Sequence, residues 1–291
     1  MKLTIFLMAV VVILLLFGCA STGEVTEVVS VEETAEPVEE EVKKEPVKII
    51  TTVFFPVLEE SYFGDGVKDE YRVFTYDVNG VLLLKEALFG ADEVLQESIV
   101  YEYTGSESCM GSIYDAAGTL LSYRFKVMDA DGNVLKKENF DNKNILQSRS
   151  EYEYEKGLKS SWMVYNASQS LLSTTNYIYT GNLLTRIESM GPGGDMEEYF
   201  ELSYNSAGML LENIHYNTDG EIEDSRSFEY KDGYLVMEKI HRKNGSVQRK
   251  IMYINDQFGN PVETVFMDSG DNVNERVIRV FESREEISYE D

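Results

Sequence analysis

The sequence is poor in the residues that form reaction centres and disulfides. Its 291 residues include two cysteines, two histidines and one tryptophan. Basic residues are scarce as well, with 26 Lys and Arg against 52 Asp and Glu, a formal net charge of −26. Such a charge repels nucleic acid and anionic headgroups, and favours cationic partners, divalent ions or simply solubility. No Ser-His-Asp order is present, so we predict a protein that is not an enzyme, with no cofactor and no nucleic-acid partner.

Long apolar runs are absent except at the N-terminus, where residues 3–17 are apolar apart from Thr4. This run is shorter than the about 20 residues that span a bilayer, and it has the length of an export signal. It leads to Leu16-Phe17-Gly18-Cys19, which resembles the lipobox of bacterial lipoproteins. The resemblance implies a signal peptide over residues 1–19, lipidation of Cys19 and an acyl chain such as palmitate. The expected location is therefore the cell membrane, on its periplasmic or surface-exposed side; the alternative is an uncleaved membrane anchor.

Residues 20–47 have the composition of a linker. They hold nine Glu, two Lys and two Pro without an aromatic residue, so little can offset the entropy of ordering them. We predict a disordered acidic tether that separates the folded part from the membrane. After lipidation of Cys19, Cys109 is the single remaining cysteine, which excludes an internal disulfide and predicts a buried or loop thiol.

Residues 48–291 show the pattern of β-hairpins. Short runs rich in Tyr, Phe, Val, Ile and Leu alternate with Gly, Asn and Asp. From Gly118 the turns recur every 11 to 14 residues, with Asn144 and Gln169 in places where Gly is missing. One hairpin therefore recurs about every 25 residues, and such a period is typical of a repeat array. We predict an all-β protein with one largely apolar and one largely polar sheet face and no helix.

Four segments share the motif Tyr-Asp/Asn-x-x-Gly, beginning at Tyr76, Tyr114, Tyr204 and Tyr216. The motif resembles the tyrosine-aspartate (YD) repeat of Rhs-like proteins over roughly residues 70 to 280. The resemblance implies an extended or curled antiparallel β-sheet, without the toxin-enclosing shell of the large family members. MORN-like hairpin repeats are the nearest alternative. The acidic stretch Glu282-Ser283-Arg284-Glu285-Glu286 is expected to protect an edge strand of this sheet.

Candidate chemistry is sparse, and no metal site is predicted. His215 and His241 lie one hairpin period apart, which suits two positions on the same face, with Glu212 or Glu238 as conceivable further ligands. The sequence Asp129-x-Asp131-Gly132-Asn133 resembles the start of a calcium loop, but turn chemistry accounts for it. Arg242-Lys243 with Arg249-Lys250 forms a basic cluster that is interpreted as a solvated hairpin face.

Tyrosine is abundant, with 19 copies, and many stand at strand ends, such as Tyr101, Tyr152 and Tyr177. Cross-strand pairing explains such residues structurally, and rows of tyrosine also suit recognition of a protein or a glycan. The favoured function is therefore a lipid-anchored binding or scaffold module of the cell envelope. The alternatives are a structural spacer or adhesin without a small ligand, and a hydrolase of envelope polymers that uses sheet carboxylates.

Overall fold

The computed structural model describes residues 25–28 and 47–290, and every regular element in them is a β-strand. No helix in these two ranges is long and apolar enough to cross a bilayer. The strands are β1 (Val25–Val28), β2 (Val47–Phe63), β3 (Lys68–Tyr76), β4 (Leu83–Gly90), β5 (Leu95–Thr104), β6 (Ser108–Asp115), β7 (Leu120–Met128), β8 (Val134–Asp141), β9 (Leu146–Glu155), β10 (Leu158–Asn166), β11 (Leu171–Thr180), β12 (Leu183–Met190), β13 (Met196–Tyr204), β14 (Leu210–Asn217), β15 (Ile222–Lys231), β16 (Tyr234–Arg242), β17 (Val247–Asn255), β18 (Pro261–Asp268) and β19 (Val273–Glu290).

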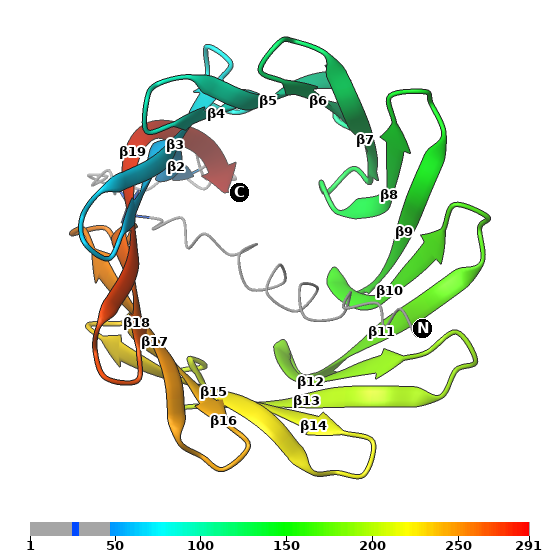
Figure 1. Cartoon of the computed structure of the whole chain (residues 1–291), viewed down its shortest axis with the longest axis vertical. Helices are drawn as coiled ribbons and strands as arrows, with labels where there is room; N and C mark the ends of the chain where they lie inside the picture. The colour runs from blue at the N-terminus through cyan, green and yellow to red at the C-terminus, as the bar shows by residue number, and fades with distance from the viewer. Residues whose placement is uncertain (1–24, 29–46, 291) are drawn as a thin grey trace, which may run out of the picture.

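The strands form a closed barrel, so the predicted extended or curled open sheet is wrong (Figure 1). Each strand from β2 to β19 pairs antiparallel with the next one in the chain, and β19 pairs back onto β2, which closes a ring of 18 strands. The closing pair runs from Glu275↔Phe63 to Glu290↔Val47 and is the longest in the barrel. Closure satisfies the backbone groups that an open sheet leaves unpaired at its edges. Residues 282–286 pair with β2 on one side, whereas the β18–β19 pairing ends at Ile278, so in the described structure this acidic stretch lies at the edge of the projecting ribbon and not of an open sheet.

The hairpin turns lie where the sequence places them. In the turn from Asp115 to Gly118, the Gly118 N–H donates to the Asp115 carbonyl and the Asp115 carboxylate accepts the Ala117 and Thr119 N–H groups. Gly118 has φ of 78°, a left-handed conformation that glycine adopts without strain. Asn144 and Gln169 take the same conformation, as their places in the spacing predicted. In the β18–β19 turn, which begins at Asp268, the left-handed residue is Asp271 and not Gly270. Asp271 is the fourth residue of that turn, and its N–H donates to the Asp268 carbonyl.

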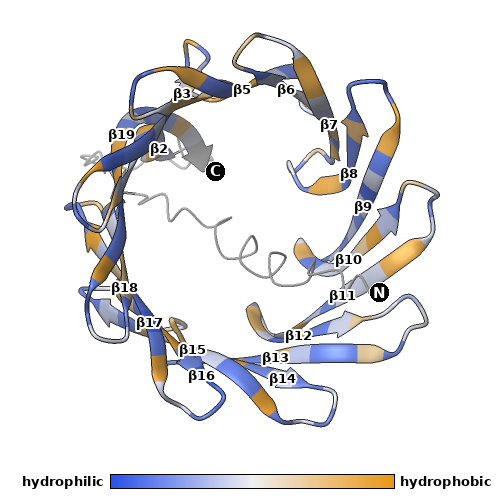
Figure 2. Ribbon diagram, viewed as in Figure 1, coloured by the Kyte–Doolittle hydropathy of each residue, from blue (hydrophilic) through white to orange (hydrophobic). Residues whose placement is uncertain are grey.

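Cross-strand pairing divides the barrel wall into two faces. Tyr101, Tyr152, Tyr177 and Tyr253 share one face, here called the inner face, and Arg186, Glu201 and Ile214 share the other, the outer face. Figure 2 shows hydrophilic and hydrophobic segments interspersed along the strands all round the ring. By register, both faces carry charged and apolar residues: the inner face holds Ile99 and Arg226–Glu238, and the outer face Ile178 and Arg186–Glu201. The prediction of one apolar and one polar face is therefore wrong. Within residues 25–28 and 47–290 no second layer covers the sheet, and the largest fully buried side chains there are those of Val265 and Asn260.

The long strands β2 and β19 continue beyond the ring as a two-stranded ribbon that also pairs with β1. The ribbon is fixed to neighbouring turns on both sides. Phe54 packs on Phe258 of the β17–β18 turn, with ring centroids 4.8 Å apart, and Arg284 donates to the Gly80 carbonyl of the β3–β4 turn. Five residues of the predicted linker thus belong to strands, namely Val25–Val28 of β1 and Val47 of β2. The rest of that linker and the predicted signal peptide with Cys19 lie outside the described residues.

Candidate functional site

Three Arg–Glu pairs lie on the inner face at and beside the seam between β19 and β2, and one of them, Arg279–Glu59, crosses it. Arg226 donates to Glu238 at 2.8 Å, Arg279 to Glu59 at 2.7 Å, and Arg72 to Glu86 at 3.1 Å. Tyrosines and a threonine complete this set, which we call the seam belt: Tyr253 donates to Glu238, Tyr101 donates to Glu86, and Thr264 accepts from Arg279. The belt places one residue on each of nine neighbouring strands, from β15 through β19 and β2 to β5.

The seam belt is most deeply buried near Glu238 and Thr264, which are 5% and 3% exposed, whereas the side chains of Arg72 and Glu59 are 37% and 31% exposed. Burial is the main cause that raises the pKa of Tyr253 and of Tyr101, so both remain neutral hydrogen-bond donors to their carboxylates. Each carboxylate is held by an arginine, and the Arg279–Glu59 pair joins the two ends of the ring directly.

The inner face changes character between β9 and β14. Tyr152 and Trp162 are cross-strand partners whose rings are stacked, with centroids 6.1 Å apart and planes within 9°. The Lys159 ammonium lies over two rings, 5.2 Å from the centroid of Tyr152 and 5.6 Å from that of Tyr177. Burial lowers the pKa of Lys159 and raises that of Tyr177. We call Tyr152, Lys159, Trp162 and Tyr177 the aromatic platform.

The inner face also carries polar atoms without partners among the described residues: two belong to the platform, and the third, on Asn213 of β14, lies three strands from Tyr177 and opposite Arg226. Among the described residues, the Trp162 indole N–H, the Tyr177 hydroxyl and the Asn213 carbonyl oxygen are buried and form no hydrogen bond. Tyr177 is 8% exposed and Asn213 is 6% exposed, and both lie on the inner face. A buried polar group without a partner costs about 1–3 kcal/mol. Such groups point to a bound molecule or ordered water that completes their hydrogen bonds.

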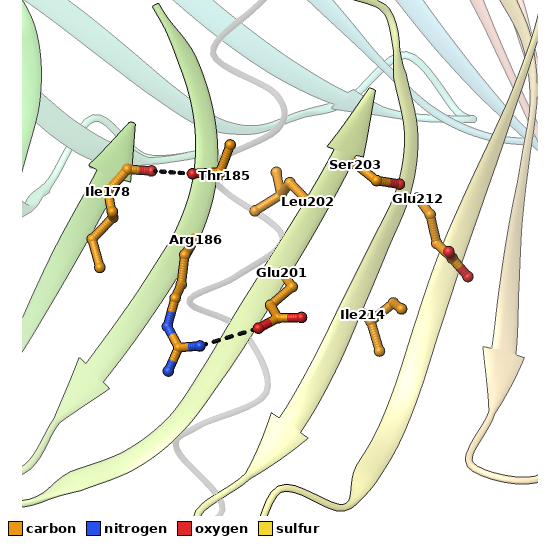
Figure 3. A pocket seen from close by; sticks show the side chains of 8 residues that line it. All are labelled: Ile178, Thr185, Arg186, Glu201, Leu202, Ser203, Glu212 and Ile214. Atoms are coloured by element: carbon orange, nitrogen blue, oxygen red, sulfur yellow. Dashed lines mark hydrogen bonds and ion pairs between the residues drawn. The ribbon is translucent and has the colours of Figure 1, made fainter. Parts of the chain in front are cut away.

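A shallow groove of 380 Å³ lies on the other side of the same wall (Figure 3). Figure 3 looks at strands β11 to β15 from outside the ring, with the far wall behind them, and shows the side chains of Ile178, Arg186, Glu201 and Ile214 on the near side. Arg186 donates to Glu201 at 3.1 Å, and Glu212 also lines the groove. Since Glu201 is engaged by Arg186, the groove offers one ion pair and aliphatic walls.

The two histidines point to opposite faces, so the expected shared face is wrong. His215 lies on the inner face opposite Asp224, and His241 lies on the outer face opposite Ser225. The intervening register shift between His215 and Tyr216 is one reason why sequence spacing misplaces them. His215 bonds to Asp224 and Glu198, at 3.1 Å and 3.0 Å, and these two bonds raise its pKa to about 9. Of the two carboxylates considered with them, Glu238 belongs to the seam belt and Glu212 to the outer groove.

The other sequence candidates have structural partners. The Asp129 carboxylate accepts from the backbone of Asp131 and Asn133 and from the Asn133 amide, as turn chemistry predicts. In the basic cluster, Lys243 pairs with Glu221 and Lys250 with Asp271. Cys109 is a free thiol that is 4% exposed, which confirms the prediction of a buried cysteine. In residues 25–28 and 47–290, no three His, Cys, Asp or Glu side chains are grouped so that they could hold a metal ion.

Sequence reasoning missed the cations of the inner face. Lys126 and Lys137 are direct cross-strand partners on β7 and β8, and Arg124 lies two residues from Lys126 on the same face. In the sequence these residues are separated by a turn and lie among acidic neighbours, so no cluster is visible. The single Trp162 was the one available signal, because a lone tryptophan within a tyrosine-rich array marks a local change of the surface.

Comparison with known proteins assigns no family. No protein-family model and no curated protein matches the chain. Among solved structures, a porin-like protein from Bacteroides uniformis is 10% identical with a TM-score of 0.34, and the match covers 90% of this chain and 98% of that one. A porin-like protein from Bacteroides vulgatus is 10% identical with a TM-score of 0.33, covering 77% and 97%. The Photorhabdus luminescens Tc holotoxin pore is 11% identical with a TM-score of 0.21, covering 77% of this chain and 15% of that one. These values are too low for any of the likenesses to assign a function to this chain.

Proposed function

We propose that the protein is a lipid-anchored envelope protein that binds a glycan on the inner face of its barrel. The observation that carries the proposal is the aromatic platform together with the unpartnered polar atoms of Trp162, Tyr177 and Asn213 on the same inner face. Sugars present apolar ring faces edged by hydroxyl groups. Stacked aromatic rings provide contact area at low entropic cost, and the Trp162 N–H, Tyr177 hydroxyl and Asn213 carbonyl provide donors and an acceptor for hydroxyl groups.

A lipid anchor suits this wall better than insertion into a bilayer does. The outer face carries ion pairs both along one strand and between neighbouring strands. Examples are Lys136–Glu138, Arg186–Glu201 and Arg276–Glu263. The inner face carries Arg226–Glu238 and the rest of the seam belt. A lysine or arginine on a lipid-facing strand costs about 2–4 kcal/mol at the bilayer midplane. Charge on both faces therefore favours water on both sides of the wall, with attachment through Cys19.

The proposal is tested by binding measurements on the full-length protein in detergent. Trp162 is the only tryptophan in the sequence, so its fluorescence emission reports directly on the platform. Cellohexaose and chitohexaose serve as neutral probes. We expect a saturable change in Trp162 emission, and Tyr152→Ala should weaken binding at least tenfold. Tyr165→Ala is the matched control, since Tyr165 lies on the outer face of the same strand as Trp162 and contacts Arg149.

Two outcomes would contradict glycan binding at this place. If no saccharide changes the emission or binds by calorimetry, the barrel is better described as a spacer. If Tyr165→Ala weakens binding as much as Tyr152→Ala does, the outer face is the binding surface instead.

A further inference from the structure

Next to the aromatic platform, the inner face carries a cluster of cations that lack acidic partners. Lys126 and Lys137 stand directly opposite each other, and Arg124 stands beside them. None of these three, nor Lys159, forms an ion pair with a carboxylate among the described residues, although the structure there contains many ion pairs. Like charges in directly opposed positions destabilise a sheet. In a chain with twice as many acids as bases, such a cluster is unusual.

The surroundings of the cluster are polar and uncharged. Lys137 is the cross-strand partner of Ser150, and Ser150 leads to Tyr152 on the same face of β9. On the other side, Lys126 is opposite the buried Cys109. Burial and the nearby charges of Arg124 and Lys126 lower the pKa of Lys137. An anion bound here would relieve the mutual repulsion of these cations.

We infer that the cations of β7 and β8 hold the acidic group of the bound sugar, so that the ligand is an anionic saccharide. This inference rests on the proposed glycan binding. Lys126 and Lys137 would bind a carboxylate or phosphate, while the sugar ring lies on Tyr152 and Trp162. Two strand spacings separate β8 from β10, about 10 Å. That span fits a short oligosaccharide with its acidic group at one end.

The charge distribution favours a small anionic ligand over a long polyanion. The cations at this place are Arg124, Lys126, Lys137 and Lys159, whereas the whole chain carries a net charge of −26. A nucleic acid extends its charge along its whole length and would meet the acidic remainder of the protein. A saccharide with one or a few acidic groups meets only the cluster.

The test compares one saccharide in charged and neutral forms. Trigalacturonate and its methyl ester share the same rings, and glucose 6-phosphate provides a phosphate in place of the carboxylate. With the full-length protein, calorimetry and Trp162 emission should show at least tenfold tighter binding of trigalacturonate than of its ester. The preference should fall as salt is raised. Tighter binding of glucose 6-phosphate than of trigalacturonate would identify phosphate as the preferred acidic group.

Lys126→Gln with Lys137→Gln removes the cluster without removing the platform. This double variant should lose the tenfold preference and bind the ester unchanged, and it should fold at least as stably because a repulsion is removed. Lys136→Gln is the control, since Lys136 is adjacent in sequence but lies on the outer face, paired with Glu138.

The outcomes separate the inference from the function on which it rests. Equal binding of acid and ester, or an acid preference that survives the double variant, overturns the anion site alone. Failure of every saccharide to bind overturns the proposed function as well. Tighter binding of a short DNA oligonucleotide than of trigalacturonate would show that the cluster takes nucleic acid and would overturn the saccharide assignment.

Discussion

In the seam half of the inner face, three arginines lie against three glutamates, whereas in the aromatic half the cations lie among rings and hydroxyl groups. Both halves are built from antiparallel hairpins, and the seam half also contains the two long strands β2 and β19. The seam half includes the joint between the two ends of the chain, which the Arg279–Glu59 pair crosses. In the aromatic half Lys126, Lys137 and Lys159 form no ion pair with a carboxylate among residues 47–290. These side chains are therefore available for a ligand.

Breaking the seam belt should produce the largest effect on stability. Glu238→Ala leaves Arg226 without its carboxylate and the Tyr253 hydroxyl without its acceptor, at a cost of about 3 kcal/mol. Urea unfolding followed by circular dichroism measures the loss. Glu201→Ala, which breaks the exposed Arg186 pair on the outer face, should cost less than about 1 kcal/mol. Equal losses in the two variants would contradict the distinction between a buried and a surface ion pair.

The hairpins were predictable from sequence because each depends on a few neighbouring residues. Asp115 and Gly118 specify their turn by local hydrogen bonds and by one left-handed residue, and both requirements can be read from the chain. Closure was not predictable in this way. Closure depends on pairing between β2 and β19, whose residues are more than 200 positions apart in the sequence. The hairpin period alone does not distinguish a closed ring from an open spiral.

The candidate site was only partly visible for a related reason. Tyr152 and Tyr177 were among the tyrosines that suited recognition from their places at strand ends, whereas Trp162 was not predicted as a binding residue. Lys126 and Lys137 meet because of the β7–β8 register, and most hairpins carry a register shift that changes which residues face each other. The same shifts separate His215 from His241, which spacing had placed on one face.

His215 provides a pH-dependent test within the aromatic half. Its folded pKa of about 9 lies above the value of about 6.5 expected in the unfolded chain, so the stabilisation is complete below pH 6.5 and is lost as the pH rises through 9. Because the contacting Asp224 is partly exposed, we expect a loss of about 2 kcal/mol over this window. Unfolding measured from pH 6 to pH 10 should show the decline in the native protein and not in His215→Gln. The seam belt contains no histidine, and an unchanged decline in His215→Gln would assign it to other groups.

The smallest expected effect concerns a feature that the two halves share. Tyr103 in the seam half and Tyr154 and Tyr204 in the aromatic half each donate to a backbone carbonyl 20 residues earlier, at 3.0, 3.0 and 2.7 Å. Each bond ties one hairpin to the previous one, and changing any of these tyrosines to Phe should cost about 1 kcal/mol. Tyr179→Phe is the matched control, because the structure gives the Tyr179 hydroxyl no bond to any residue in 47–290. Similar losses at Tyr103 and Tyr204 would show that the halves differ in their charges and not in their hairpin ties. A loss confined to Tyr103 would mean that the joint, rather than the repeat, sets the stability of the ring.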